Sequence, residues 1–213
     1  MAQLWSYLVA HRDEIAAAVR THAGLSAAAL CIAVLATIPL GVWCAHHKAA
    51  AAGVIAAVNA ARVVPSLAVL TLMLPILGLG FRPALVALTL LACPPILINA
   101  YVGFRDVDAS VTEAATAMGM TASEVIRRIE APLAFPIVIA GVRTAAVEVI
   151  ASATLATFIG GGGLGDLINN GLQLDDATML LTGAVLVAAM ALAAEIALSG
   201  VARLARAATG EAF

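Results

Sequence analysis

Residue types that commonly carry catalysis or bind metals are few and scattered along this chain. The four histidines all lie near its start, and none of them stands in an acidic cluster. They are His11, His22, His46 and His47. The three cysteines, Cys31, Cys44 and Cys93, lie in or beside apolar stretches without the spacing of metal ligands. We therefore expect no catalytic constellation, no metal site and no cofactor.

A glycine run at positions 160–163 could suggest nucleotide binding. It continues into Leu164, Gly165 and Asp166. A phosphate-binding loop of the common nucleotide-binding kind follows a strand and ends in Lys-Ser or Lys-Thr, and the sequence here predicts neither feature. We therefore interpret the run as flexible or tightly packed backbone.

The polar stretch 105–131 carries the strongest local signals. Ser110 and Glu113 have the spacing of a capping box, in which a hydroxyl and a later Glu satisfy exposed backbone amides at a helix start. Thr121 and Glu124 repeat that spacing, and Gly119 between the two pairs can end the first helix in a left-handed conformation. We predict two short helices that meet at a bend. From the residues alone, such a hairpin either inserts into a groove on a partner protein or lies on a membrane surface.

Polar side chains within the apolar stretches are the remaining candidates, because ionisable groups in a membrane are costly and tend to be functional. They are Asn59, Arg62, Ser66, Asn99, Arg143, Glu148 and Glu195. In one interpretation, four of them line a solute pathway, namely Asn59, Ser66, Asn99 and Glu148. The other is internal ion pairing, with Glu148 bound to Arg143 or to Arg62.

The chain that must position these residues is far more apolar than a soluble protein. Of its 213 residues, 63% are hydrophobic and 11% are charged, against about 45–50% and about 25% in typical soluble domains. A soluble fold could not hide so much apolar surface from water, whereas in a lipid bilayer it need not be hidden. The formal net charge of −2 and the lack of a basic run give no indication of nucleic acid as a partner. We predict an all-α membrane protein.

Five apolar stretches are long enough to cross the bilayer, which takes about 20 helical residues. They are 25–44, 53–77, 83–104, 133–158 and 178–201. Pro65 and Pro75 lie in the second stretch, and Pro94 and Pro95 in the third, so we expect these two spans to be bent or partly unwound. We divide the chain into a lead-in segment 1–24, a transmembrane domain 25–206 and a tail 207–213.

The distribution of Lys and Arg predicts how the spans are oriented, because cytoplasmic loops are enriched in them. One orientation places six such residues inside and three outside. The inside set is Lys48, Arg105, Arg127, Arg128, Arg203 and Arg206, and the outside set is Arg12, Arg20 and Arg82. We therefore predict the N-terminus outside and the C-terminus inside, with stretch 105–131 inside and the glycine run outside.

The inside stretch resembles the EAA motif of ABC-importer permeases, which reads Glu-Ala-Ala, three residues, Gly, nine residues, Ile, one residue, Leu-Pro. The matching positions here are Glu113, Ala114, Ala115, Gly119, Ile129 and Pro132. The one departure is Ala131, where the family usually has Leu, which would loosen local packing but keeps the spacing. The resemblance implies that the loop forms coupling helices that bind a cleft of a cytoplasmic ATPase subunit. The implied coupling residues are Glu113, Ala114, Ala115, Met118, Gly119 and Thr121.

Segments 63–80, 94–108 and 141–168 resemble permeases of the osmoprotectant type, which import glycine betaine, carnitine, choline or similar quaternary amines. The implied fold is the transmembrane domain of a type I ABC importer, with five core helices as in methionine permeases, in a bacterial inner membrane. The implied partners are a second permease subunit (identical or a sister chain), two cytoplasmic ATPase subunits and a separate extracytoplasmic substrate-binding protein. The run 160–166 would then form an outer loop or gate near that binding protein.

Two alternatives stay open at this point. The nearer one is a permease for another small solute such as methionine, which transport assays with both solutes would separate. An ATP-independent membrane channel is the alternative from a different class, and it requires the loop 105–131 to lie on lipid. Co-purification of an ATPase subunit would distinguish it.

Overall fold

The computed structural model describes residues 2–209, and every regular element in that range is helical. The all-α prediction is therefore confirmed for the described chain. The elements are α1 (Ala2–Ala10), α2 (Arg12–His46), α3 (Lys48–Ala61), α4 (Ser66–Leu77), α5 (Phe81–Arg105), α6 (Ala109–Ala117), α7 (Ala122–Val125), the π-helical segment η1 (Ile126–Glu130), α8 (Ala131–Ser152), the 3₁₀ segment η2 (Ala153–Ile159), α9 (Leu164–Gln173) and α10 (Ala177–Thr209).

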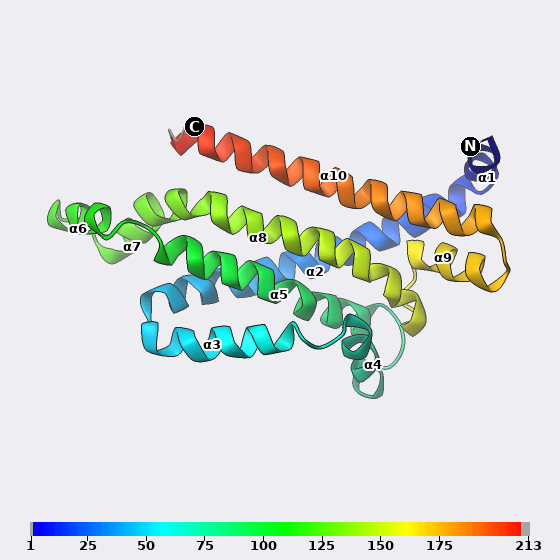
Figure 1. Cartoon of the computed structure of the whole chain (residues 1–213), viewed down its shortest axis with the longest axis horizontal. Helices are drawn as coiled ribbons and strands as arrows, with labels where there is room; N and C mark the ends of the chain where they lie inside the picture. The colour runs from blue at the N-terminus through cyan, green and yellow to red at the C-terminus, as the bar shows by residue number, and fades with distance from the viewer. Residues whose placement is uncertain (1, 210–213) are drawn as a thin grey trace.

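Four long helices run along the longest axis of the molecule (Figure 1). Helix α5 packs against both α2 and α8, and α10 packs against α8 and α9. Small residues allow the closest of these crossings. A Cβ added at Gly41 would lie 2.6 Å from the Cβ of Ala100, and one added at Gly141 would lie 2.6 Å from the Cβ of Asn99. In lipid, the hydrophobic effect does not drive helices together, so membrane helices associate largely through close packing at small residues.

The candidate membrane spans agree with the five predicted stretches in part. Helices α2, α5 and α10 and the continuous segment Ala122–Ile159 are each long and apolar enough to cross a membrane. The pair α3 and α4 passes the same test only together, with a bend of 93° between the two helices. The described chain therefore holds four candidate spans, or five if the bent pair is one span.

The proline-containing stretches behave differently from each other. The second is broken as predicted, because α3 ends at Ala61 and α4 begins directly after Pro65. The third stays α-helical throughout α5, with Pro94 and Pro95 inside it. Unwinding of the third stretch, one of the two predicted outcomes, therefore does not occur. A proline inside a membrane helix is tolerated where neighbours and local adjustments satisfy the freed carbonyls.

The first long helix begins earlier than the apolar pattern predicted. Helix α2 starts at Arg12, so residues 12–24 continue into the first span. Asp13 and Glu14 lie in its first turn, where negative charge is favourable at a helix N-terminus. His22, which belongs to the predicted lead-in segment, is fully buried, and its Nε2 lies 2.9 Å from the carbonyl oxygen of Ile150. Of the predicted tail, residues 207–209 continue α10, and 210–213 lie outside the described residues.

The two ends of the bundle carry different features (Figure 1). Helices α6 and α7, the α2–α3 junction and the end of α10 lie at one end, called here the hairpin end. Helices α1 and α9 lie at the other end. The region after the glycine run, expected to be a loop, contains α9, which starts at Leu164.

Candidate functional site

The predicted hairpin exists, and its first helix is capped by Asp108. The Asp108 side chain accepts a hydrogen bond from the backbone N–H of Ser110 at 2.8 Å, and this bond lowers the pKa of the Asp108 carboxyl from its ordinary value. The predicted capping box of Ser110 and Glu113 is therefore wrong. Asp is at least as good an N-cap as Ser, and here it begins the helix at Ala109, one position before Ser110.

The first hairpin helix ends in a Schellman motif, in which Gly119 adopts the left-handed conformation. Gly119 has a φ of +89°, and its N–H donates to the carbonyl of Thr116 at 2.9 Å. The N–H of Met120 donates to the carbonyl of Ala115 at 3.2 Å, which completes the motif. The prediction that Gly119 ends this helix is confirmed.

The second hairpin helix begins with the predicted capping box. The N–H of Thr121 donates to the Glu124 carboxylate at 3.0 Å, and the N–H of Glu124 donates to the Thr121 hydroxyl at 3.4 Å. This helix is not separate from the next span, however. Helix α7 continues through η1 into α8 without a break at Ala131 or Pro132. The hairpin and α8 are therefore joined by continuous helix.

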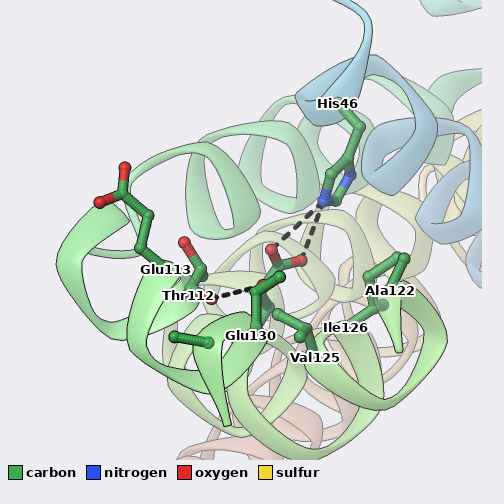
Figure 2. A pocket seen from close by; sticks show the side chains of 9 residues that line it. His46, Thr112, Glu113, Ala122, Val125, Ile126 and Glu130 are labelled. Atoms are coloured by element: carbon green, nitrogen blue, oxygen red, sulfur yellow. Dashed lines mark hydrogen bonds and ion pairs between the residues drawn. The ribbon is translucent and has the colours of Figure 1, made fainter. Parts of the chain in front are cut away.

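Most of the six predicted coupling residues are accessible on the hairpin. Ala115 is the exception, at 1% exposed, so it supports the hairpin from inside. Met118 is 77% exposed at the bend. The carboxylate of Glu113 points away from the hairpin interior (Figure 2). The exposed members are Glu113, Ala114, Met118, Gly119 and Thr121.

A cavity of 560 Å³ lies between the hairpin and the end of α2. His46 and Glu130 both line it and point toward each other (Figure 2). His46 Nε2 lies 3.0 Å from one Glu130 carboxylate oxygen and 3.3 Å from the other. Glu130 is only 8% exposed, so this pair fixes the end of the first span to the segment between hairpin and α8. No pattern in the sequence predicts the pair, because its members are 84 positions apart.

A second ion pair joins Arg143 of α8 to Glu195 of α10. The structure therefore assigns Arg143 an internal ion pair, as one interpretation proposed, but the partner is Glu195 and not Glu148. Facing charges on packed helices neutralise each other where water is scarce.

Loss of one member of this pair should destabilise the bundle more than loss of both. In Arg143→Gln the Glu195 carboxylate keeps its charge without a partner, whereas Arg143→Gln/Glu195→Gln leaves two neutral groups. We expect the single variant to lower the midpoint of thermal unfolding in detergent by several degrees and the double variant to recover most of that loss. Equal midpoints for the two variants would show that the pair has no structural role.

A third feature is a cavity of 510 Å³ among α3, α4, α5 and α8. Glu148 lines it, and so does Arg62. The other three predicted pathway residues are not brought to it. Asn59 is exposed on α3, Ser66 begins α4, and Asn99 donates from Nδ2 to the carbonyl of Pro95 at 2.8 Å. Of the four predicted pathway residues, Glu148 is therefore the one that lines this cavity.

The glycine run forms tightly packed backbone at the end of the bundle opposite the hairpin. It consists of Gly160, Gly161, Gly162 and Gly163 and is followed by Leu164, Gly165 and Asp166. Leu164 is fully buried, and Asp166 accepts a hydrogen bond from the Thr157 hydroxyl at 2.5 Å. A Cβ added at Gly161 would lie 2.8 Å from the Cβ of Ala156. Of the two interpretations of the run, tight packing is the one observed.

These features define a class of protein. The described chain is a helical bundle with four or five candidate spans, a capped hairpin at one end and internal ion pairs, and this is the class of multi-pass membrane proteins. No group of three or more potential metal ligands occurs in the described chain. Residues 37–207 match the family of binding-protein-dependent transport system inner membrane components. The chain belongs to this family, whose members are non-catalytic subunits of multi-pass inner membrane transporters.

Two relatives and one solved structure are similar to this chain over nearly its whole length. The glycine betaine/carnitine/choline transport system permease protein OpuCB of Bacillus subtilis is 41% identical, over 90% of this chain and 88% of that protein. The choline transport system permease protein OpuBB of the same organism is 39% identical, over 93% of this chain and 92% of that protein. Among solved structures, the inward-facing MetNI methionine ABC transporter matches with a TM-score of 0.78 at 23% identity, over 90% of this chain and 95% of that one. The last likeness confirms the predicted type of fold.

Proposed function

We propose that this chain is the permease subunit of an ATP-driven importer for osmoprotectant quaternary amines such as glycine betaine, carnitine and choline. The observation that carries this proposal is the 41% identity to a glycine betaine/carnitine/choline permease, which extends over nine-tenths of the chain. The family itself depends on a substrate-binding protein. The likeness to a methionine transporter supports the fold and does not favour methionine as the solute.

The proposed assembly pairs this permease with a second one, identical or a sister chain, and with two ATPase subunits inside and one binding protein outside. In it, the N-terminus is outside and the C-terminus inside. What supports this orientation is that the hairpin and the end of α10 lie at the same end of the bundle (Figure 1). Lys48, Arg105 and Arg127 also belong to that end, as cytoplasmic loops favour.

In this assembly the exposed hairpin residues are the coupling surface. Glu113, Ala114, Met118, Gly119 and Thr121 would contact the ATPase subunit, while Ala115 and the His46–Glu130 pair hold the surface in place. The continuity of α7 with α8 supports direct transmission of ATPase closure to the bundle. Segment 160–166 would form the outer gate near the binding protein.

Uptake by the reconstituted transporter tests the proposed function. The chain is placed in proteoliposomes with its ATPase and binding protein, and labelled glycine betaine, choline and methionine are compared with and without ATP. We expect ATP-dependent uptake of glycine betaine or choline and none of methionine. Uptake of methionine alone would transfer the protein to a different solute class, and flux that needs no ATP would indicate a channel.

A further inference from the structure

The 510 Å³ cavity among α3, α4, α5 and α8 carries one group of each charge in an otherwise apolar wall. Its volume lies within the range of small-molecule sites, about 300–1,000 Å³. Glu148 of α8 lines it together with Arg62, which directly follows α3. The remaining lining residues have no charged side chain.

This cavity lies between the two ends of the bundle and is open at the surface of this chain, because Arg62 and Leu90, which line it, are exposed. Pro94 is 11 positions from the hairpin end of α5, and Glu148 is 17 positions from that end of α8. At 1.5 Å per residue these positions lie roughly 16 Å and 26 Å along the bundle. A solute between the two ends of the bundle could therefore occupy it.

The two charged groups remain available to a ligand. In the described part of the chain no ion pair joins Arg62 to Glu148, and Arg143, the other candidate partner of Glu148, is bound to Glu195. Leu90 and Leu91 also line the cavity, and the residues four positions later are Pro94 and Pro95, which have no backbone N–H. The carbonyls of Leu90 and Leu91 thus lack the usual helical donor.

The wall suits one kind of cation in particular. A primary ammonium has three N–H donors and is costly to bury without acceptors for them. A quaternary ammonium has no donor, so it needs only an opposite charge and apolar contact for its methyl groups. The Arg62 guanidinium complements a carboxylate, which it can bind through two parallel hydrogen bonds.

We propose that this cavity is a solute site for a betaine, in which Glu148 holds the quaternary ammonium and Arg62 holds the carboxylate. The inference rests on the proposed function, because it names the chemistry by which the permease itself would recognise its solute. The site discriminates between solutes: a betaine uses both charged residues, whereas choline, which has no carboxylate, uses Glu148 alone.

Uptake of the two solutes by charge variants tests this site. Glu148→Gln is expected to reduce uptake of both glycine betaine and choline about tenfold or more, the size expected for losing a charge-assisted contact. Arg62→Gln is expected to reduce uptake of glycine betaine to the same degree and to leave choline nearly unchanged. Glu148→Asp, which keeps the charge, should recover part of the uptake. Matched controls at exposed positions are Glu14→Gln and Arg82→Gln, which should transport as the wild type does.

Three outcomes would overturn the inference while leaving the proposed function standing, because each is judged against an active wild type. Unchanged uptake in Glu148→Gln would exclude the cation site. Equal losses of glycine betaine and choline uptake in Arg62→Gln would show that Arg62 does not bind the carboxylate. Restored uptake in the exchanged variant Glu148→Arg/Arg62→Glu would show an internal ion pair instead. A wild type that takes up neither solute would overturn the proposed function itself.

Discussion

A Gly119→Asp chain is expected to assemble in the membrane, but its ATP-driven uptake should fall about tenfold or more. Substitutions at the centre of a protein–protein interface commonly cost this much binding free energy. Gly119 lies at the exposed bend of the hairpin, and nothing within this chain lies within 4 Å of an added Cβ. A new side chain there would therefore meet the partner and not the bundle. Uptake and the ATP hydrolysis stimulated by loaded binding protein should fall together.

The backbone and the contact surface can be separated at this position. Gly119 has a φ of +89°, which Asn and Asp adopt at a lower cost than Ala, although Ala has the smaller side chain. A larger loss of uptake in Gly119→Asn and Gly119→Asp than in Gly119→Ala would therefore point to the contact surface. A Gly119→Asp chain that still transports would contradict a coupling role for the bend.

Features that depend on neighbouring residues could be predicted from the sequence. The Schellman motif at Gly119 and the capping box at Thr121 each close within a few positions, and the break at Pro65 follows from the missing N–H of one residue. The error at the start of α6 has the same local origin. Asp108 and Ser110 are both good caps two positions apart, and spacing alone does not decide between them.

Features that depend on how helices face each other could not be predicted. Arg143 and Glu195 are 52 positions apart, and His46 and Glu130 are 84 apart. In a soluble helix an apolar stripe would show which side faces inward, but helices that are apolar all round carry no such stripe. Their rotation is fixed instead by close contacts such as that of Gly141 with Asn99, which are seen only in the packed bundle. The partner of Arg143 was therefore predicted wrongly.

Replacing Gly165 by Ala is expected to destabilise the glycine-run end of the bundle strongly. A Cβ at this position would lie 2.1 Å from the carbonyl oxygen of Thr154 and 3.0 Å from its Cα. Both atoms are backbone, so no side-chain rotation relieves the clash, and α9 must move away from η2. Overpacking of this kind costs about 1–3 kcal/mol or more, so the midpoint of thermal unfolding in detergent should fall by about 5 °C or more.

The close approach at Gly165 is one of several contacts that hold α9 against its neighbours. Helix α9 packs against η2 and α10, and the Thr157–Asp166 hydrogen bond closes the turn between α9 and η2. A gate in this segment would therefore move as one packed unit and not as a loose loop. Gly24→Ala is the matched control, because it lies inside α2 with nothing within 4 Å of the added Cβ, and it should leave the midpoint unchanged or raise it. If Gly165→Ala unfolds at the wild-type temperature, α9 and η2 do not pack as closely as this geometry requires, and the gate need not move as a unit.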